Sequence, residues 1–194
     1  TTSKRSKFIY CRDQSGDVLD LLKTHYPDAH CALKHKNSFE LLVATVLSAQ
    51  CTDERVNKVT PSIFKKYPTP EKMARASLPD LEDLVRSTNF YKNKAKNLIA
   101  CAKVLVSRHQ GQVPKSLELL TELAGVGRKT ANVVLGNAFG LVTGVVVDTH
   151  VGRLSQRLGW SDAESPRDIE TDLCSLFPQD EWIKLSHYLI FHGR

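Results

Sequence analysis

Hydrophobic positions recur along most of the chain at the spacing of amphipathic helices. The clearest apolar stripe runs through residues 39–50, and a longer one runs through residues 90–108. Residues 141–147 are rich in β-branched side chains, but no nearby segment could pair with them as a strand. We therefore interpret 141–147 as a buried crossing segment. Helical patterns joined by short links, without a set of strands, predict an all-α protein.

Cap residues and prolines indicate where these helices begin and end. The first helix is expected to end at Pro27, and Ser38 and Thr52 are expected N-caps of the next two. Pro61 either breaks the helix that follows Thr52 or opens a new one. Ser165 is expected to cap a helix at 166–177, and the other helices expected near the end are 150–158 and 179–194.

Residues 116–139 predict two helices joined by a tight glycine turn. Each helix has a single apolar face, formed by Leu117, Leu120 and Ala124 before the turn and by Ala131, Val134, Leu135 and Ala138 after it. Gly125 and Gly127 flank Val126, and both can adopt positive φ. The free N–H groups at the start of the second helix lie at the positive end of its dipole, which suits a phosphate.

Lys129 falls in the first turn of that second helix. It projects roughly opposite the apolar stripe, and the helix dipole there disfavours a positive charge. Both features suit a lysine that reacts as a neutral amine toward an electrophilic carbon. The alternative is a solvated or phosphate-pairing lysine, and spacing alone favours that alternative.

Asp148 lies at the end of the apolar run and just before a helix. An aspartate followed by Thr-His-Val at a helix start is well explained as an N-cap. A capping carboxylate is also fixed in place with one oxygen left over for chemistry. The two interpretations are compatible.

Composition narrows the class of protein. The net charge of +6 favours a polyanionic partner. No signal peptide and no membrane-spanning apolar run is apparent, so we expect a soluble protein with no membrane partner. The cysteines are odd in number and widely spaced, which predicts a reduced, intracellular protein, and the neighbours His30, Cys31 and His35 fit no zinc pattern. These cysteines are Cys11, Cys31, Cys51, Cys101 and Cys174.

Three motifs together resemble endonuclease III, a helix-hairpin-helix DNA repair glycosylase and abasic-site lyase. They are Leu-Ala-Gly-Val-Gly-Arg-Lys-Thr-Ala-Asn-Val-Val at 123–134, Val-Asp-Thr-His-Val-x-Arg at 147–153 and Leu-Ser-Ala-Gln-Cys-Thr-Asp at 47–53. The resemblance extends from about residue 19 to residue 194. Two rival motifs fail, since Gly-Arg-Lys-Thr is not a P-loop and Gly-Val-Gly lacks the third glycine of a dinucleotide fold.

The resemblance implies two helical lobes with a DNA-binding cleft between them. Residues 31–142 would form a six-helix lobe that carries the helix-hairpin-helix at about 116–139. Residues 1–30 and 143–194 would form a second, discontinuous lobe, with residues 1–12 as a loose basic arm. Lys129 would come from one lobe and Asp148 from the other.

The resemblance also implies a bifunctional enzyme of base excision repair that removes oxidised pyrimidines from duplex DNA. After the damaged base rotates out of the duplex, Lys129 attacks C1′ and displaces it, leaving a Schiff base. Loss of the 2′ proton then expels the 3′ phosphate by β-elimination. Asp148 would help to deprotonate the lysine and stabilise the positive sugar, and no metal or nucleotide takes part.

Further residues would contact DNA by the same resemblance. Gln50 would fill the space of the extruded nucleotide, although a frayed helix end explains a glutamine equally well. Phe90 would be a wedge in the opposite strand, although aromatics at such a turn are commonly core. The remaining candidate contacts are Tyr91, Lys92 and Lys94 near the wedge, and Gly125, Val126, Gly127, Arg128 and Thr130 in the hairpin.

The chain departs from the family pattern in two places. The family usually carries a 4Fe–4S cluster on four cysteines that follow its His-Gly-Arg motif; here that motif ends the chain, so the ligands would lie beyond Arg194. Ending on a helix-like run without a cap favours a missing segment over a cluster-lacking relative. The link from Gly140 to Asp148 is also one residue longer than is common.

Two rival functions remain open at this stage. A mismatch adenine glycosylase without lyase activity would carry a small hydroxyl or another residue in place of Lys129. A helix-hairpin-helix module that only binds DNA would explain the hairpin and the charge, but not Lys129, Asp148 and the Gln50 motif together.

We expect a monomer that binds double-stranded DNA with a damaged base or abasic site. Its expected location is the cytoplasm and nucleoid of a bacterium, or the nucleus or an organelle of a eukaryote. The preferred lesion is not predicted.

Overall fold

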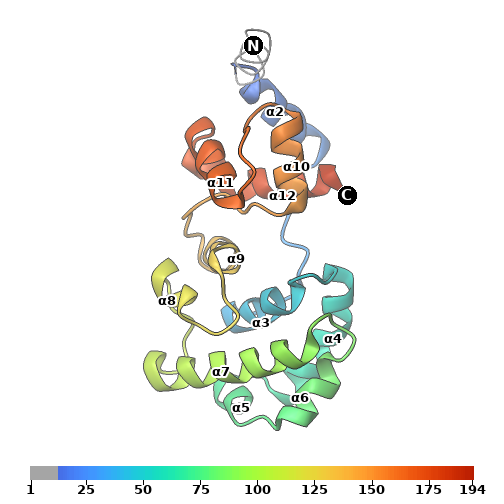
Figure 1. Ribbon diagram of the computed structural model, residues 1–194, viewed down its shortest axis with the longest axis vertical. Helices are drawn as coiled ribbons and strands as arrows, with labels where there is room; N and C mark the ends of the chain where they lie inside the picture. The colour runs from blue at the N-terminus through green and yellow to red at the C-terminus, as the bar shows by residue number, and fades with distance from the viewer. Residues whose placement is uncertain (1–12) are drawn as a thin grey trace. The chain divides into compact units, whose positions relative to one another are not determined.

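The computed structural model describes residues 13–194 and shows helices joined by connecting segments, with no strand in that range (Figure 1). The predicted all-α class is confirmed. The basic arm predicted at 1–12 lies outside the described residues. None of the described helices is long and apolar enough to cross a membrane.

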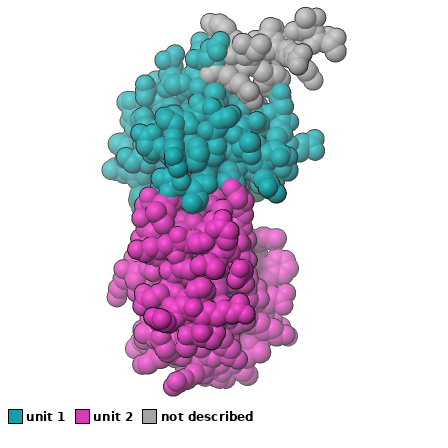
Figure 2. All heavy atoms as spheres, turned by 90° about the vertical axis from the view of Figure 1, so that its left-hand side faces the viewer, with its two compact units in different colours: residues 1–31, 142–194 teal, residues 32–141 magenta. Residues whose placement is uncertain are grey.

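The chain divides into two compact units (Figure 2). Unit 2 is the continuous segment Ala32–Leu141, and unit 1 combines the chain up to Cys31 with Val142–Arg194. The division proposed from the family resemblance, 31–142, differs from these limits by one residue at each end. Unit 2 has seven helices where six were expected, since two of them, α5 and α8, are short helices of five residues each.

Unit 2 is built around α3, whose residues from Phe39 to Leu47 are all buried. A helix that is buried on every side must be covered by its neighbours, and α4, α7 and α9 pack against it (Figure 1). The helices of unit 2 are α3 (Ser38–Ser48), α4 (Asp53–Lys66), α5 (Pro70–Ala74), α6 (Leu78–Val85), α7 (Tyr91–His109), α8 (Leu117–Thr121) and α9 (Arg128–Phe139).

Two expected helix ends in unit 2 are wrong. The N-cap of α3 is Asn37, because its side-chain oxygen accepts the Glu40 N–H at 2.9 Å; Ser38 is already helical. Pro61 lies inside α4 and neither breaks it nor opens a new helix. The Thr52 cap and the buried side chains on both sides of the proline, Val56 and Ile63, hold α4 together despite the missing N–H.

Unit 1 has its own core around Trp160, which is fully buried and packs edge-on against Phe177. Val145 and Val147 join this core, whereas Leu141 and Thr143 are exposed, so the crossing segment is buried only in its second half. The helices of unit 1 are α2 (Ser15–His25), α10 (Thr149–Arg157), α11 (Pro166–Leu176), the 3-10 turn η1 (Gln179–Glu181) and α12 (Trp182–Gly193).

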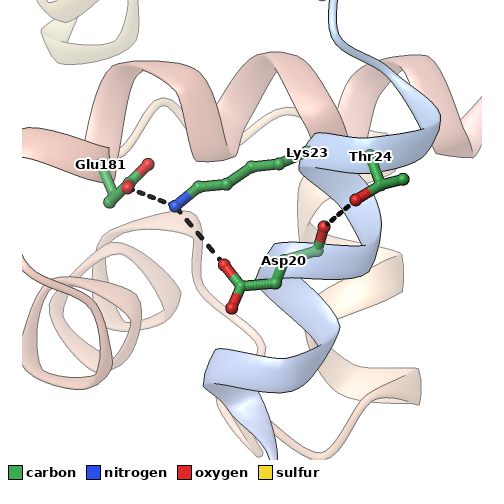
Figure 3. Close-up of polar contacts among 4 residues, drawn as sticks. All are labelled: Asp20, Lys23, Thr24 and Glu181. Atoms are coloured by element: carbon green, nitrogen blue, oxygen red, sulfur yellow. Dashed lines mark hydrogen bonds and ion pairs between the residues drawn. The ribbon is translucent and has the colours of Figure 1, made fainter.

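An ion pair joins the two distant chain segments of unit 1. Lys23 on α2 donates to Glu181 at 2.5 Å and also lies 3.7 Å from Asp20 (Figure 3). The hydrogen bond that Lys23 donates to Glu181 raises the pKa of Lys23 above its usual value. Because the lysine is partly exposed and screened by water, we expect the pair to stabilise unit 1 by less than about 1 kcal/mol.

Candidate functional site

The hairpin between α8 and α9 has one glycine in the left-handed region. Gly125 has φ +77°, whereas Gly127 has φ −88° and an extended backbone, so the expectation of positive φ at both glycines is wrong. A Cβ on Gly125 would lie 3.0 Å from the Cβ of Asn97 on α7, while a Cβ on Gly127 would meet nothing within 4 Å. Only Gly125 is therefore required by the local geometry.

Between these glycines, Val126 is buried and anchors the turn, and Leu123 and Ala131 are buried on either side. Gly127 is the N-cap of α9 and has no side chain to bond the first N–H groups of that helix. Uncapped N–H groups at the positive end of a helix can bind an anion. The hairpin thus has the local geometry to bind a phosphate.

Lys129 is the second residue of α9, and its side chain is exposed. Within unit 2, the ammonium makes no hydrogen bond or ion pair. Arg128 beside it is exposed as well, and Thr130 is half-buried. The first turn of α9 therefore presents a lysine that is not paired with any carboxylate of unit 2.

Asp148 is the N-cap of α10 in unit 1. Its Oδ1 accepts the backbone N–H groups of His150 at 2.9 Å and Val151 at 2.8 Å. Its Oδ2 makes no hydrogen bond within the described part of unit 1, residues 13–31 and 142–194. The cap thus orients the carboxylate and leaves one oxygen available.

Gln50 and Phe90 occupy two turns of unit 2 with unusual backbone conformations. Gln50 has φ 51° and Phe90 has φ 57°, both in the left-handed region that side chains other than glycine rarely adopt. Both side chains are exposed, and Phe90 is 62 % exposed. The stripe that was expected to run as helix to Gln50 ends as helix at Ser48.

The three candidate residues in the first turn of α7 differ in how far they are exposed to solvent. Tyr91 is half-buried and Lys92 is exposed. Lys94 is only 5 % exposed, and its Nζ donates to the backbone oxygen of Leu47 at 2.8 Å. This burial contradicts the predicted phosphate contact at Lys94, and desolvation lowers the pKa of its ammonium.

The sequence analysis did not identify one residue of this region, Asn89, as a candidate. The Asn89 side chain donates to the backbone oxygen of Gln50 at 2.6 Å. The only sequence feature that could have pointed to Asn89 was its position next to an aromatic residue at the start of a helix. Asparagine is common at such turns, so this feature is not specific.

The residues that the structure describes offer no set of ligands for an iron–sulfur cluster. No group of three or more His, Cys, Asp or Glu side chains within 13–194 is placed to hold a metal ion. A 4Fe–4S cluster requires four converging cysteine thiolates. The cysteines of this range therefore do not fit the cluster that endonuclease III usually carries.

Comparison with known proteins places these features in a family. Residues 43–179 match the HhH-GPD superfamily base excision DNA repair proteins. The chain is 50 % identical to endonuclease III of Synechocystis sp. over 183 residues, which are 94 % of this chain and 84 % of that protein. It is 44 % identical to endonuclease III of Bacillus subtilis over 188 residues, 95 % of this chain and 81 % of that protein.

The fold is also that of solved endonuclease III structures. The structure of a trapped endonuclease III–DNA covalent intermediate superposes with a TM-score of 0.89 at 46 % identity, covering 93 % of this chain and 84 % of that one. A non-covalent endonuclease III–DNA complex matches equally well. The chain therefore belongs to the endonuclease III family, the DNA glycosylases with abasic-site lyase activity within the HhH-GPD superfamily.

Proposed function

We propose that this protein removes oxidised pyrimidines from duplex DNA, with Lys129 as the nucleophile and Asp148 as its proton acceptor. The observation that carries the proposal is the exposed Lys129 ammonium, which has no partner within unit 2, on the first turn of the helix after the hairpin. A lysine paired with a carboxylate would have to give up that partner before it could attack. Within unit 2, Lys129 has no such partner to lose.

The reaction begins with the damaged nucleotide rotated out of the duplex. Unstacking costs a few kcal/mol, and a lesion lowers that cost. We assign Gln50 to fill the vacated space and Phe90 to enter the opposite strand, because both side chains are exposed on turns with a defined backbone conformation. Apolar wedges of this kind are known to unstack bases.

Lys129 then attacks C1′ of the sugar through its neutral amine. The C1′–N glycosidic bond breaks and its electron pair leaves with the base, which takes up a proton. The nitrogen bound to C1′ loses a proton and its lone pair forms the C=N bond of the protonated Schiff base. The C1′–O4′ bond breaks at the same time, its electron pair goes to O4′, and O4′ takes up a proton. The iminium acidifies the 2′ proton; when that proton leaves, the C3′–O bond breaks and the 3′ phosphate departs.

Asp148 is assigned the proton transfer from Lys129 and the stabilisation of the positive sugar. Its Oδ1 is occupied by two backbone N–H groups, which fix the carboxylate, and its Oδ2 makes no hydrogen bond within the described part of unit 1. We propose that the protein works as a monomer.

The hairpin and the neighbouring basic residues would bind the DNA backbone. The uncapped N–H groups of α9 suit a phosphate, and the exposed Arg128 and Lys92 add positive charge. Such contacts position the duplex without reading its sequence, and they make binding weaker as salt increases. The net charge of +6 is consistent with this partner.

Borohydride trapping on a duplex with one abasic site tests the proposal. The unaltered protein should form a covalent adduct, Lys129→Ala should form none, and Lys103→Ala, at an exposed lysine on α7, should react normally. An adduct that persists in Lys129→Ala would overturn the assignment. Absence of any adduct with the unaltered protein would favour a glycosylase without lyase activity or a DNA-binding module.

A panel of duplexes tests the substrate class. Oxidised pyrimidine, 8-oxoguanine and an adenine mismatch should be compared at the same sequence position, in single-turnover reactions. We expect the oxidised pyrimidine to be excised at least about tenfold faster than the other bases. This ratio corresponds to a difference of about 1.4 kcal/mol in activation free energy. Equal or reversed rates would contradict the proposed specificity.

A further inference from the structure

We infer that Asn89 is a positioning residue that holds the Gln50 turn and the Phe90 turn together as one two-pronged wedge. The inference rests on the proposed function, since it concerns how the two side chains assigned to enter the duplex are held. It adds a residue, Asn89, and a physical link between two turns that lie 39 residues apart in the chain.

The backbone of both turns calls for such a constraint. Gln50 and Phe90 both adopt left-handed φ values, 51° and 57°, which are strained for a residue other than glycine. Phe90 is bulky, which makes the conformation rarer still. Residues persist in such conformations when the surrounding structure holds them there.

Two hydrogen bonds provide the constraint, and both come from the segment that carries Phe90. The Asn89 amide donates to the oxygen of Gln50 at 2.6 Å, and the Lys94 ammonium donates to the oxygen of Leu47 at 2.8 Å. Lys94 therefore fixes the end of α3, and Asn89 fixes the tip of the turn that follows. Residues 89–94 and 47–50 behave as one piece through these two bonds (α3 and α7 in Figure 1).

The two bonds differ in what their loss would do. Lys94 is buried and its bond supports the packing of unit 2. Asn89 is exposed, and its bond reaches only the backbone of the exposed Gln50 turn. Removing the Asn89 amide should therefore leave the fold intact and free the Gln50 turn to move relative to Phe90.

A rigid wedge matters because it inserts into a stacked duplex. If the two side chains were on independently mobile turns, part of the binding energy would be spent on ordering them. Holding them at a fixed separation before DNA arrives lets both enter together, Gln50 into the vacated space and Phe90 into the opposite strand. Asn89 thus acts through Gln50 and Phe90 and need not touch the reacting sugar.

Asn89→Ala tests the inference, with Asn93→Ala as its matched control. The Asn93 side chain is exposed on α7 and makes no hydrogen bond within unit 2. Asn89→Ala should slow single-turnover excision from duplex DNA about five- to tenfold at saturating protein, the size of effect expected for one lost hydrogen bond. Its thermal midpoint and its dissociation constant for undamaged duplex should match those of Asn93→Ala.

A single-stranded abasic oligonucleotide separates positioning from a general defect. It has no stack to open, so Asn89→Ala should form the Schiff base on it at the rate of the unaltered protein. A loss of the same size on single-stranded and duplex substrates would overturn the inference. So would an excision rate on duplex DNA that Asn89→Ala leaves unchanged.

A double-mutant cycle with Gln50→Ala tests the coupling directly. Without the glutamine side chain there is less to hold in place, so Asn89→Ala should add less than about twofold to the effect of Gln50→Ala; full additivity contradicts the link. If the unaltered protein gives the Lys129-dependent adduct while the cycle is additive, the wedge inference fails and the proposed function stands. If no adduct forms at all, it is the proposed function that fails.

Discussion

The Lys94 ammonium donates a hydrogen bond to the backbone oxygen of Leu47, and this contact joins the first turn of α7 to the last turn of α3. The C-terminal carbonyls of a helix lie at the negative end of its dipole and attract a cation. Burial opposes the charge, which is why the pKa of Lys94 is lowered. The lysine belongs to the interior of unit 2 rather than to a DNA-binding surface.

Lys94→Met should destabilise the protein. The substitution keeps most of the side-chain volume but leaves the Leu47 oxygen without its donor, which costs about 1–3 kcal/mol when the group stays buried. Lys96→Met, at an exposed position on the same helix, should change the free energy of unfolding by less than about 0.5 kcal/mol. Urea unfolding measures both. If Lys94→Met weakened DNA binding but left the free energy of unfolding unchanged, the result would support the predicted phosphate contact at Lys94 and contradict the structural role.

The two hairpin glycines should respond differently to alanine. Gly125→Ala forces a Cβ onto a backbone with φ +77° and brings it 3.0 Å from Asn97, so it should cost about 1–2 kcal/mol and weaken DNA binding. Gly127→Ala has an ordinary φ and open space, and should fold normally. Thermal unfolding and duplex affinity together check the pair. Equal destabilisation by both would contradict the assignment of strain to Gly125.

Local signals in the sequence were sufficient to predict most of the fold. The N-caps at Thr52 and Ser165 act as expected, each through its own side-chain oxygen. Periodicity located the long helix α7, and the buried residues of its apolar stripe include Ala95, Leu98, Ala102 and Leu105. Such features depend on neighbours three or four residues away, so the sequence displays them directly.

The end of α3 depends on contacts that no local pattern displays. Gln50 continues the helical spacing, yet its turn is held by Asn89 from a distant segment. The burial of Lys94 could have been predicted from helical spacing, because Lys94 lies four residues before Leu98 and seven before Cys101 on the buried face of α7. Its charge suggested solvent, whereas the carbonyl of Leu47, 47 residues away, provides its partner.

Asp148 allows its capping role and its chemical role to be separated. Asp148→Asn keeps an oxygen that can accept the N–H groups of His150 and Val151, so stability should change by less than about 0.5 kcal/mol. Asp148→Ala removes the cap and should cost about 1 kcal/mol. Both should lower the rate of Schiff-base formation by at least about tenfold if the charge is needed. Normal rates in Asp148→Asn would leave the residue a helix cap alone.

His187 should make stability fall in mild acid. Burial, with a smaller contribution from His30, lowers the pKa of His187 from 6.5 to about 4, so the folded protein holds the imidazole neutral. The unfolded chain takes up a proton below about pH 6.5, and the folded chain does so only near pH 4. Stability is therefore fully present above about pH 6.5 and is lost as the pH falls toward 4, by up to about 3 kcal/mol.

Urea unfolding at several values between pH 4 and pH 7 measures this dependence. His187→Gln should flatten the slope, because the substituted side chain does not titrate in that range. His25→Gln, at an exposed position on α2 of the same unit, should retain it. A slope that survives in His187→Gln would show that other groups cause the acid sensitivity, and a flat profile in the unaltered protein would show that His187 is protonated without cost.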